Sequence, residues 1–112
     1  MITGQWEVAT IAFNGTTSTA VDLGREYEKL LIYLPVLTSA TIKIQAAEIL
    51  ASTYADIYTT DKASGNQKQV ITTATTGQFM WIAPIGGFRY VKIVSSVAQG
   101  AESAIRVCGV RS

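Results

Sequence analysis

Histidine is absent from the 112 residues, and cysteine occurs once, at Cys108. The absence of histidine removes the commonest general base, the commonest transition-metal ligand and any catalytic triad built on an imidazole. A single cysteine excludes an intramolecular disulfide, and its apolar neighbours favour a buried side chain. We therefore expect no catalytic residue, no metal and no cofactor.

Long apolar runs are also missing. The strongest one, residues 30–37, contains Pro35 and is far too short to cross a bilayer. Residues 1–6 lack the basic and apolar stretches of a secretory signal. We therefore expect no membrane contact, and synthesis in a reducing compartment suits the lone cysteine.

Charge is sparse and balanced. Nine basic and eight acidic residues give a formal net charge of +1, and charged residues make up 15% of the chain, well below the usual ~25%. The basic residues form no run, whereas proteins that bind nucleic acid usually carry a basic stripe. No spacing of the carboxylates singles out the pair that a glycoside hydrolase needs. The sequence thus predicts neither a nucleic-acid partner nor an enzyme.

What the chain does have is a single domain's length and a clear strand pattern. Residues 1–112 suit one domain, and 48% of them are hydrophobic. Short stretches rich in Thr, Val, Ile and Tyr alternate polar and apolar side chains between Gly, Asn, Asp and Pro. They predict eight or nine short strands at residues 5–13, 18–23, 29–34, 40–46, 54–60, 69–73, 78–82, 88–95 and 104–110.

This pattern contains no intervening helices, so it predicts an all-β, antiparallel β-sandwich, and eight strands in two sheets favour a jelly roll. We expect strands to stop at Gly24, at Pro84 and at the Gly86–Gly87 pair, and the strand at residues 29–34 to end or to reach a sheet edge at Pro35. The most polar stretch, residues 61–67, is the best candidate for an exposed loop.

Two of the expected strands, residues 29–34 and 79–82, are apolar on both faces. One face can enter the core, and the other then needs cover from a partner subunit or a folded-over loop. Arginine and large aromatic residues are favoured where subunits meet, although a solvated strand face or simple core filling is the plainer interpretation. The candidate interface residues are Met80, Trp81, Arg89, Tyr90, Arg106 and Arg111.

An alternative use of the aromatic residues is sugar binding, because an exposed ring can stack on a pyranose. Tyr54, Tyr58 and Trp81 are the candidates for such a platform. The two hypotheses differ in what they need: an interface needs a partner, and a platform needs rings on one open surface.

Three segments resemble small β-sandwich virion proteins of tailed bacteriophages: LIYLPVLTSATIKIQ at residues 31–45, WIAPIGGFRYVKI at residues 81–93 and RVCGVRS at residues 106–112. The resemblance extends from about Gly24 to Ser112. That group includes jelly-roll decoration, or cement, proteins, which sit on the outside of the phage head.

The resemblance implies a non-enzymatic decoration protein, made in the cytoplasm of the host bacterium, that binds the major capsid protein at the capsid surface and forms homodimers or homotrimers. Many equivalent sites would strengthen individually modest contacts through avidity. Two alternatives remain open: a carbohydrate-binding or receptor-binding module, and a structural component of the tail or baseplate.

Overall fold

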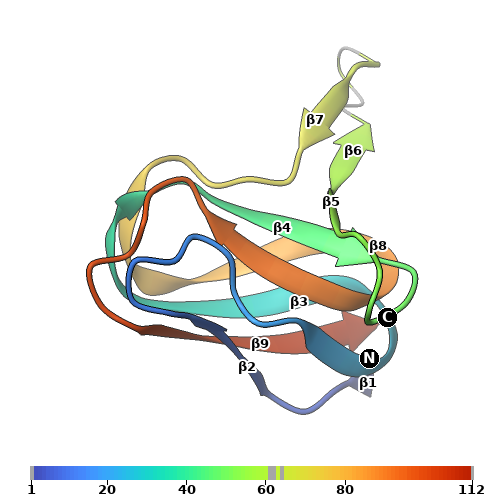
Figure 1. Ribbon diagram of the computed structural model, residues 1–112. Helices are drawn as coiled ribbons and strands as arrows, with labels where there is room; N and C mark the ends of the chain where they lie inside the picture. Colours follow the sequence, from blue (N-terminus) through green and yellow to red (C-terminus); the bar gives the residue numbers. More distant parts are fainter. Residues whose placement is uncertain (1, 61–62, 64, 112) are drawn as a thin grey trace.

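The computed structural model describes residues 2–60, 63 and 65–111, and its elements are all β-strands. The fold class predicted from the sequence, an antiparallel β-sandwich, is confirmed (Figure 1). Within the described residues, no helix is long and apolar enough to cross a membrane. The strands are β1 (Ile2–Thr3), β2 (Glu7–Ile11), β3 (Val21–Ala40), β4 (Ile42–Ala47), β5 (Ala55–Asp56), β6 (Tyr58–Thr60), β7 (Gln67–Gln69), β8 (Thr75–Ser95) and β9 (Ser103–Arg111).

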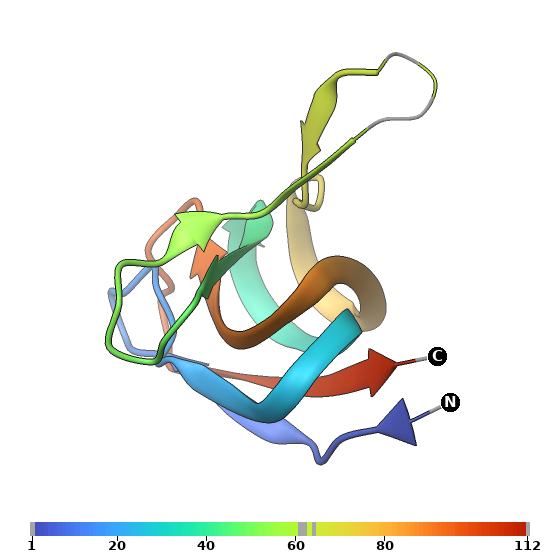
Figure 2. The same ribbon diagram turned by 90° about the vertical axis from the view of Figure 1, so that its right-hand side faces the viewer.

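Two long strands, β3 and β8, build both layers of the sandwich. They pair with each other along most of their length and curl, so that one sheet in the order β1-β9-β3-β8-β4-β5 folds over on itself (Figure 2). In the first layer, β1 and β2 pair with β9, β9 pairs with residues 29–33 of β3, and β3 pairs with the first half of β8. In the second layer, the other halves of β3 and β8 are followed by β4 and β5.

The predicted strand ends at Gly24 and at Gly86–Gly87 are wrong, because these glycines form the corner between the layers. The register of β3 against β8 shifts between Asp22 and Tyr27, which is the mark of a β-bulge. Gly24, Gly86 and Gly87 all have positive φ, which side chains with a Cβ rarely adopt. The glycines therefore bend both strands without interrupting either one.

Proline does not end a strand either: at Pro35 the structure has the other predicted outcome, a sheet edge, whereas the predicted stop at Pro84 is wrong. Pro35 lies inside β3, two residues beyond Tyr33, which is the last residue of β3 that pairs with β9. Because that edge of β3 is unpaired at Pro35, the missing N–H removes no bond to β9. Pro84 is likewise part of β8, where it lies opposite Lys29. Two strands, β3 and β8, are therefore longer than the turn residues predict.

The core lies between the two layers and draws on each of their long strands. Its largest side chains with under 2% exposure include Ile32 from β3, Ile44 from β4, Ile93 from β8 and Ile105 from β9. Cys108 is buried, as predicted, and its Sγ donates to the Gly4 carbonyl at 3.3 Å. The inner faces of the two layers thus make one aliphatic core.

The two-stranded ribbon of β6 and β7 projects away from the sandwich (Figures 1 and 2). Its base is fixed by two buried residues, since Val70 N–H donates to the Ile57 carbonyl at 2.9 Å and Ile57 N–H donates to the Ile44 carbonyl at 3.2 Å. Of the predicted loop at residues 61–67, positions 61, 62 and 64 lie outside the described residues. We call strands β6 and β7 together the arm.

Candidate functional site: an apolar sheet face

A row of exposed side chains crosses four strands of the first layer. Register places Val8 of β2 opposite Arg106 of β9, Arg106 opposite Tyr33 of β3, and Tyr33 opposite Met80 of β8. Side chains directly opposite one another on antiparallel strands stand on the same face. All four are exposed: Met80 by 55%, Val8 by 52% and Tyr33 by 39%. Three of them are apolar or aromatic residues that point away from the core.

A second row lies beside the first. Ile82 of β8 is opposite Leu31 of β3, and it is 62% exposed, although isoleucine is among the residues most often buried. Trp6, which precedes β2, lies against this surface, with the guanidinium of Arg106 5.6 Å from the centre of its ring. We call this surface the outer apolar face; it comprises Trp6, Val8, Leu31, Tyr33, Met80, Ile82 and Arg106.

The centre of the outer apolar face is a shallow depression of about 310 Å³ lined by Trp6, Tyr33, Met80 and Arg106. The alternation of β3 explains why these residues lie outside: Leu30, Ile32 and Leu34 have no exposed surface, so the intervening positions must face away from the core. The mixture of tryptophan, tyrosine, methionine and arginine is the composition that protein–protein interfaces favour.

Of the six predicted interface residues, the structure brings two together. Met80 and Arg106 both belong to the outer apolar face, on either side of Tyr33. Trp81 alternates with Met80 and packs against the hydrophobic core instead. The residues of this face that the prediction did not name as interface residues are Val8, Leu31, Tyr33, Ile82 and Trp6. The signal for three of them was the strand pattern itself, because residues 29–34 and 79–82 are apolar on both faces.

Arg89, Tyr90 and Arg111 lie elsewhere. The Arg89 guanidinium binds the Asp22 carboxylate with two donors, Nε to Oδ1 at 2.7 Å and Nη2 to Oδ2 at 3.1 Å, and lies 5.1 Å from the centre of the Tyr90 ring. These hydrogen bonds lower the pKa of Asp22 and raise that of Arg89. Arg111 lines a different depression, together with Arg25, near the corner glycine Gly87.

The residues of the predicted glycan platform do not share one surface. Lys92 Nζ lies 4.5 Å from the centre of the Tyr54 ring, and the Tyr54 hydroxyl donates to the Leu50 carbonyl at 3.0 Å. Burial and the nearby Tyr90 raise the pKa of Tyr54. Tyr58 is on the arm, and Trp81 faces the core. A cation thus covers the Tyr54 ring, the Tyr58 ring is exposed, and the partly buried Trp81 ring packs against the core.

The outer surface of the second layer is polar, and its groups bind one another. Asp56 on β5 accepts from Lys43 Nζ at 3.0 Å, from Gln45 Nε2 at 3.0 Å and from Gln69 Nε2 at 3.3 Å. The hydrogen bonds from Gln45 and Lys43 lower the pKa of Asp56. A general acid at neutral pH needs a raised pKa, so this carboxylate is a structural anion. Within the described residues, no group of three or more Cys, Asp or Glu is placed to hold a metal ion.

No family model matches the chain, and no curated protein matches its sequence. The fold is similar to the crystal structure of the SPBc2 prophage-derived protein YomS, with a TM-score of 0.55 and 16% sequence identity over 97% of this chain and 95% of that chain. This likeness extends over nearly the whole of both chains and shows a shared β-sandwich fold.

Two other solved structures are less similar. Chitosan-binding module 1 of a chitosanase/glucanase from Paenibacillus sp. IK-5 has a TM-score of 0.41 and 16% identity, over 94% of this chain and 76% of that chain. The capsid asymmetric unit of cyanophage Pam1 has a TM-score of 0.35 and 20% identity, over 96% of this chain and 84% of that chain.

Proposed function

We propose that this chain is a non-enzymatic structural protein of a phage virion, which self-associates through the outer apolar face and decorates the head as a cement protein. The observation that carries the proposal is the cross-strand row of Val8, Arg106, Tyr33 and Met80, extended by Ile82. Scattered exposed apolar residues need no explanation, but a contiguous apolar patch with aromatic residues is typical of an interaction site. The fold, shared with a protein of prophage origin, supports the phage assignment.

A second copy of this chain is the occupant that suits this face best. Arg106 is the charged residue of the face, and its guanidinium already lies over the Trp6 ring, so the face carries a spread positive charge on an aromatic surface. An apolar surface with so little charge matches itself across a two-fold axis without bringing many like charges together. This geometry supports a homodimer, whereas a homotrimer would need a second, different contact.

The absence of catalysis is part of the proposal. The chain has no histidine, and the two aspartates with shifted pKa values, Asp22 and Asp56, are both shifted toward the ionised form. Neither of them is therefore suited to act as a general acid near neutral pH. A protein that works by adhesion needs a rigid fold and a surface, and both are present.

The contact with the major capsid protein is assigned to the arm. Both figures show the arm extending beyond the sandwich, away from β1, β2 and β9 (Figures 1 and 2). Its base is held by the Asp56 carboxylate, which Lys43 of β4 and Gln69 of β7 both bind. A ribbon with a fixed base loses less conformational entropy on docking than a free loop. In a dimer, two arms reach two capsid sites, which multiplies modest affinities.

The first experiment measures self-association by sedimentation equilibrium, with Met80→Glu as the test variant. Burying a carboxylate in an apolar contact should weaken association by at least about tenfold. Ile49→Glu is the matched control, because Ile49 is also an exposed apolar residue but lies in the turn after β4. A monomeric wild-type protein, or equal effects of both substitutions, would refute self-association through this face.

The second experiment adds the purified protein to phage heads that lack it and images them by cryo-electron microscopy. Regular density on the outside of the head, with greater resistance of the heads to heat, is the expected result. Density confined to the tail or baseplate would contradict head decoration and support the alternative of a structural component of the tail or baseplate. Absence of binding to any part of the virion would contradict a structural role.

A further inference from the structure

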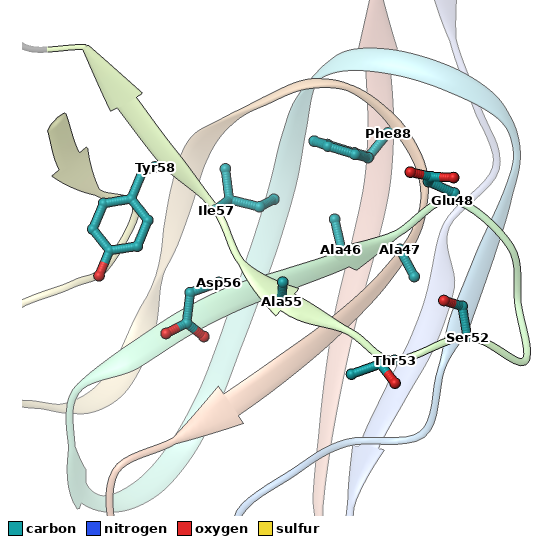
Figure 3. A pocket seen from close by; sticks show the side chains of 10 residues that line it. All are labelled: Ala46, Ala47, Glu48, Ser52, Thr53, Ala55, Asp56, Ile57, Tyr58 and Phe88. Atoms are coloured by element: carbon teal, nitrogen blue, oxygen red, sulfur yellow. The ribbon is translucent and has the colours of Figure 1, made fainter.

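A second hollow, of about 420 Å³, lies in the second layer, at the end of β4 and beside β5 (Figure 3). It shares no residue with the outer apolar face. A volume of this size falls within the ~300–1,000 Å³ range of small-molecule sites. Its lining residues are Ala46, Ala47, Glu48, Ser52, Thr53, Ala55, Asp56, Ile57, Tyr58 and Phe88.

The hollow exists because three alanines meet where larger side chains would fill the space. Ala46 and Ala47 are the last residues of β4, and Ala55 of β5 lies opposite Ala46. Figure 3 shows these methyl groups in the middle of the site, with Phe88 above them. Phe88 belongs to β8, just after the corner glycines, and its side chain is 39% exposed. Its ring is therefore available to a ligand in the hollow.

Polar groups line the rest of the hollow. The Glu48 carboxylate lies on the same side as Phe88, and the hydroxyls of Ser52 and Thr53 lie below the alanines (Figure 3). Asp56 adds a second carboxylate, which accepts hydrogen bonds from Lys43 and Gln45. The lining contains no lysine or arginine. The Glu48 carboxylate and two hydroxyls thus line the hollow together with the exposed rings of Phe88 and Tyr58.

We propose that this hollow binds one hexopyranose unit of a glycan that carries no acidic groups. The C–H face of a pyranose is apolar and packs against an aromatic ring, while its hydroxyls donate to carboxylates and exchange hydrogen bonds with hydroxyls. Phe88 supplies the ring, Glu48 the acceptor, and Ser52 and Thr53 the hydroxyls. The Glu48 carboxylate repels a uronic or sialic acid at short range and tolerates an amino sugar, whereas the Asp56 carboxylate is already paired with Lys43 at 3.0 Å.

The site differs from the glycan platform predicted from the sequence. Of Tyr54, Tyr58 and Trp81, only Tyr58 lines the hollow, at its outer end on β6 (Figure 3). Phe88 supplies the ring beside the alanines, which its position next to two glycines did not reveal. The proposal is also independent of self-association, because the hollow and the outer apolar face belong to different layers. Either can fail while the other holds.

The test is a titration of the ¹⁵N-labelled chain of 112 residues with three soluble probes, followed by backbone amide shifts. The probes are oligomers of N-acetylglucosamine, of glucosamine and of galacturonic acid. The first two should shift the amides of Glu48, Thr53 and Phe88, and the glucosamine oligomer should bind more tightly at low salt. Galacturonate should shift none of them. Galacturonate binding at these amides, or no response to the first two probes, would overturn the proposal.

Two variants locate the binding. Phe88→Ala should weaken the affinity for the N-acetylglucosamine oligomer about tenfold, because it removes the apolar ring against which the C–H face of the sugar packs. Phe13→Ala is the matched control, since Phe13 is also an exposed phenylalanine but lies in the turn after β2 and outside the hollow. Ala55→Leu should block the hollow from its exposed side and abolish the shifts. Unchanged binding in both Phe88→Ala and Ala55→Leu, with the spectrum of a folded protein, would place any glycan elsewhere.

Discussion

The outer surfaces of the two layers differ sharply, although their inner surfaces form one core. On the second layer, outward side chains pair among themselves: Lys43 with Asp56, and Arg89 with Asp22. On the first layer, the outward side chains are Val8, Tyr33 and Met80, with Arg106 over Trp6. The polar side chains of the second layer bind one another, whereas the first layer exposes apolar side chains to water.

This difference separates what stabilises the fold from what is left for a partner. Removing a polar group from the second layer breaks hydrogen bonds within the chain, whereas removing an apolar group from the outer apolar face removes contact with solvent. At roughly 25 cal/mol per Å² of apolar surface buried, the favourable free energy of that face is realised only when a partner covers it. Substitutions on the two layers should therefore affect different measurements.

The inner surfaces should respond alike, and this is the largest expected effect. Ile32→Ala in the first layer and Ile44→Ala in the second layer each remove a fully buried side chain. Each should lower the free energy of unfolding by about 2–5 kcal/mol, measured by urea denaturation, because the loss of apolar burial is joined by a cavity. A cost below about 1 kcal/mol for one of them would show that its layer does not share the core.

The outer surfaces should respond differently to truncation. Asp56→Ala removes the acceptor for Lys43, Gln45 and Gln69, and we expect a loss of about 1 kcal/mol in unfolding free energy. Met80→Ala should change the unfolding free energy of the monomer by less than about 0.5 kcal/mol, since Met80 is 55% exposed. Dilution to a monomeric concentration is needed for this comparison, and equal costs would contradict it.

The strand alternation of the sequence was enough to predict the fold class and much of the core. The apolar positions Ile42, Ile44 and Ala46 are all buried, as their period of two indicates. The predicted strand end at Gly24 failed, and Pro35 lies at a sheet edge without ending its strand, for the same physical reason. A glycine or proline stops a strand only when no neighbour continues to pair with it, and here β8 continues beyond both.

The candidate sites were less predictable than the fold. That residues 29–34 and 79–82 carry apolar side chains on both faces was visible in the sequence and predicted a covered surface. The row from Val8 to Met80 was not visible in the sequence, because it depends on the register between strands far apart in the chain. The hollow depends on strands β4, β5 and β8, which bring Ala46, Ala55 and Phe88 together. No local sequence pattern encodes this arrangement.

Acid should weaken the polar surface selectively. The pKa values of Asp22 and Asp56 in the folded protein lie below the ordinary value of 3.8, so their contribution to stability is complete above that value. It is lost as the pH falls through the lowered folded pKa values. The unfolding free energy should thus fall below about pH 4 by an amount that Asp56→Asn reduces. Urea midpoints from pH 2 to pH 7 would measure this, and an unchanged slope in Asp56→Asn would contradict it.

Salt should produce the smallest effect and separates the two surfaces most directly. The Arg89–Asp22 pair is exposed, so screening it with salt should change the unfolding free energy very little. Self-association through the outer apolar face should change less than about twofold in dissociation constant between ~0.05 and ~0.5 M NaCl, since little charge is buried. Sodium sulfate should tighten it, because this salt is excluded from apolar surface. Sedimentation in both salts provides the measurement. A dissociation constant that rises about tenfold with NaCl would mean that ion pairs hold the copies together, and the polar surface of the second layer would then be the interface.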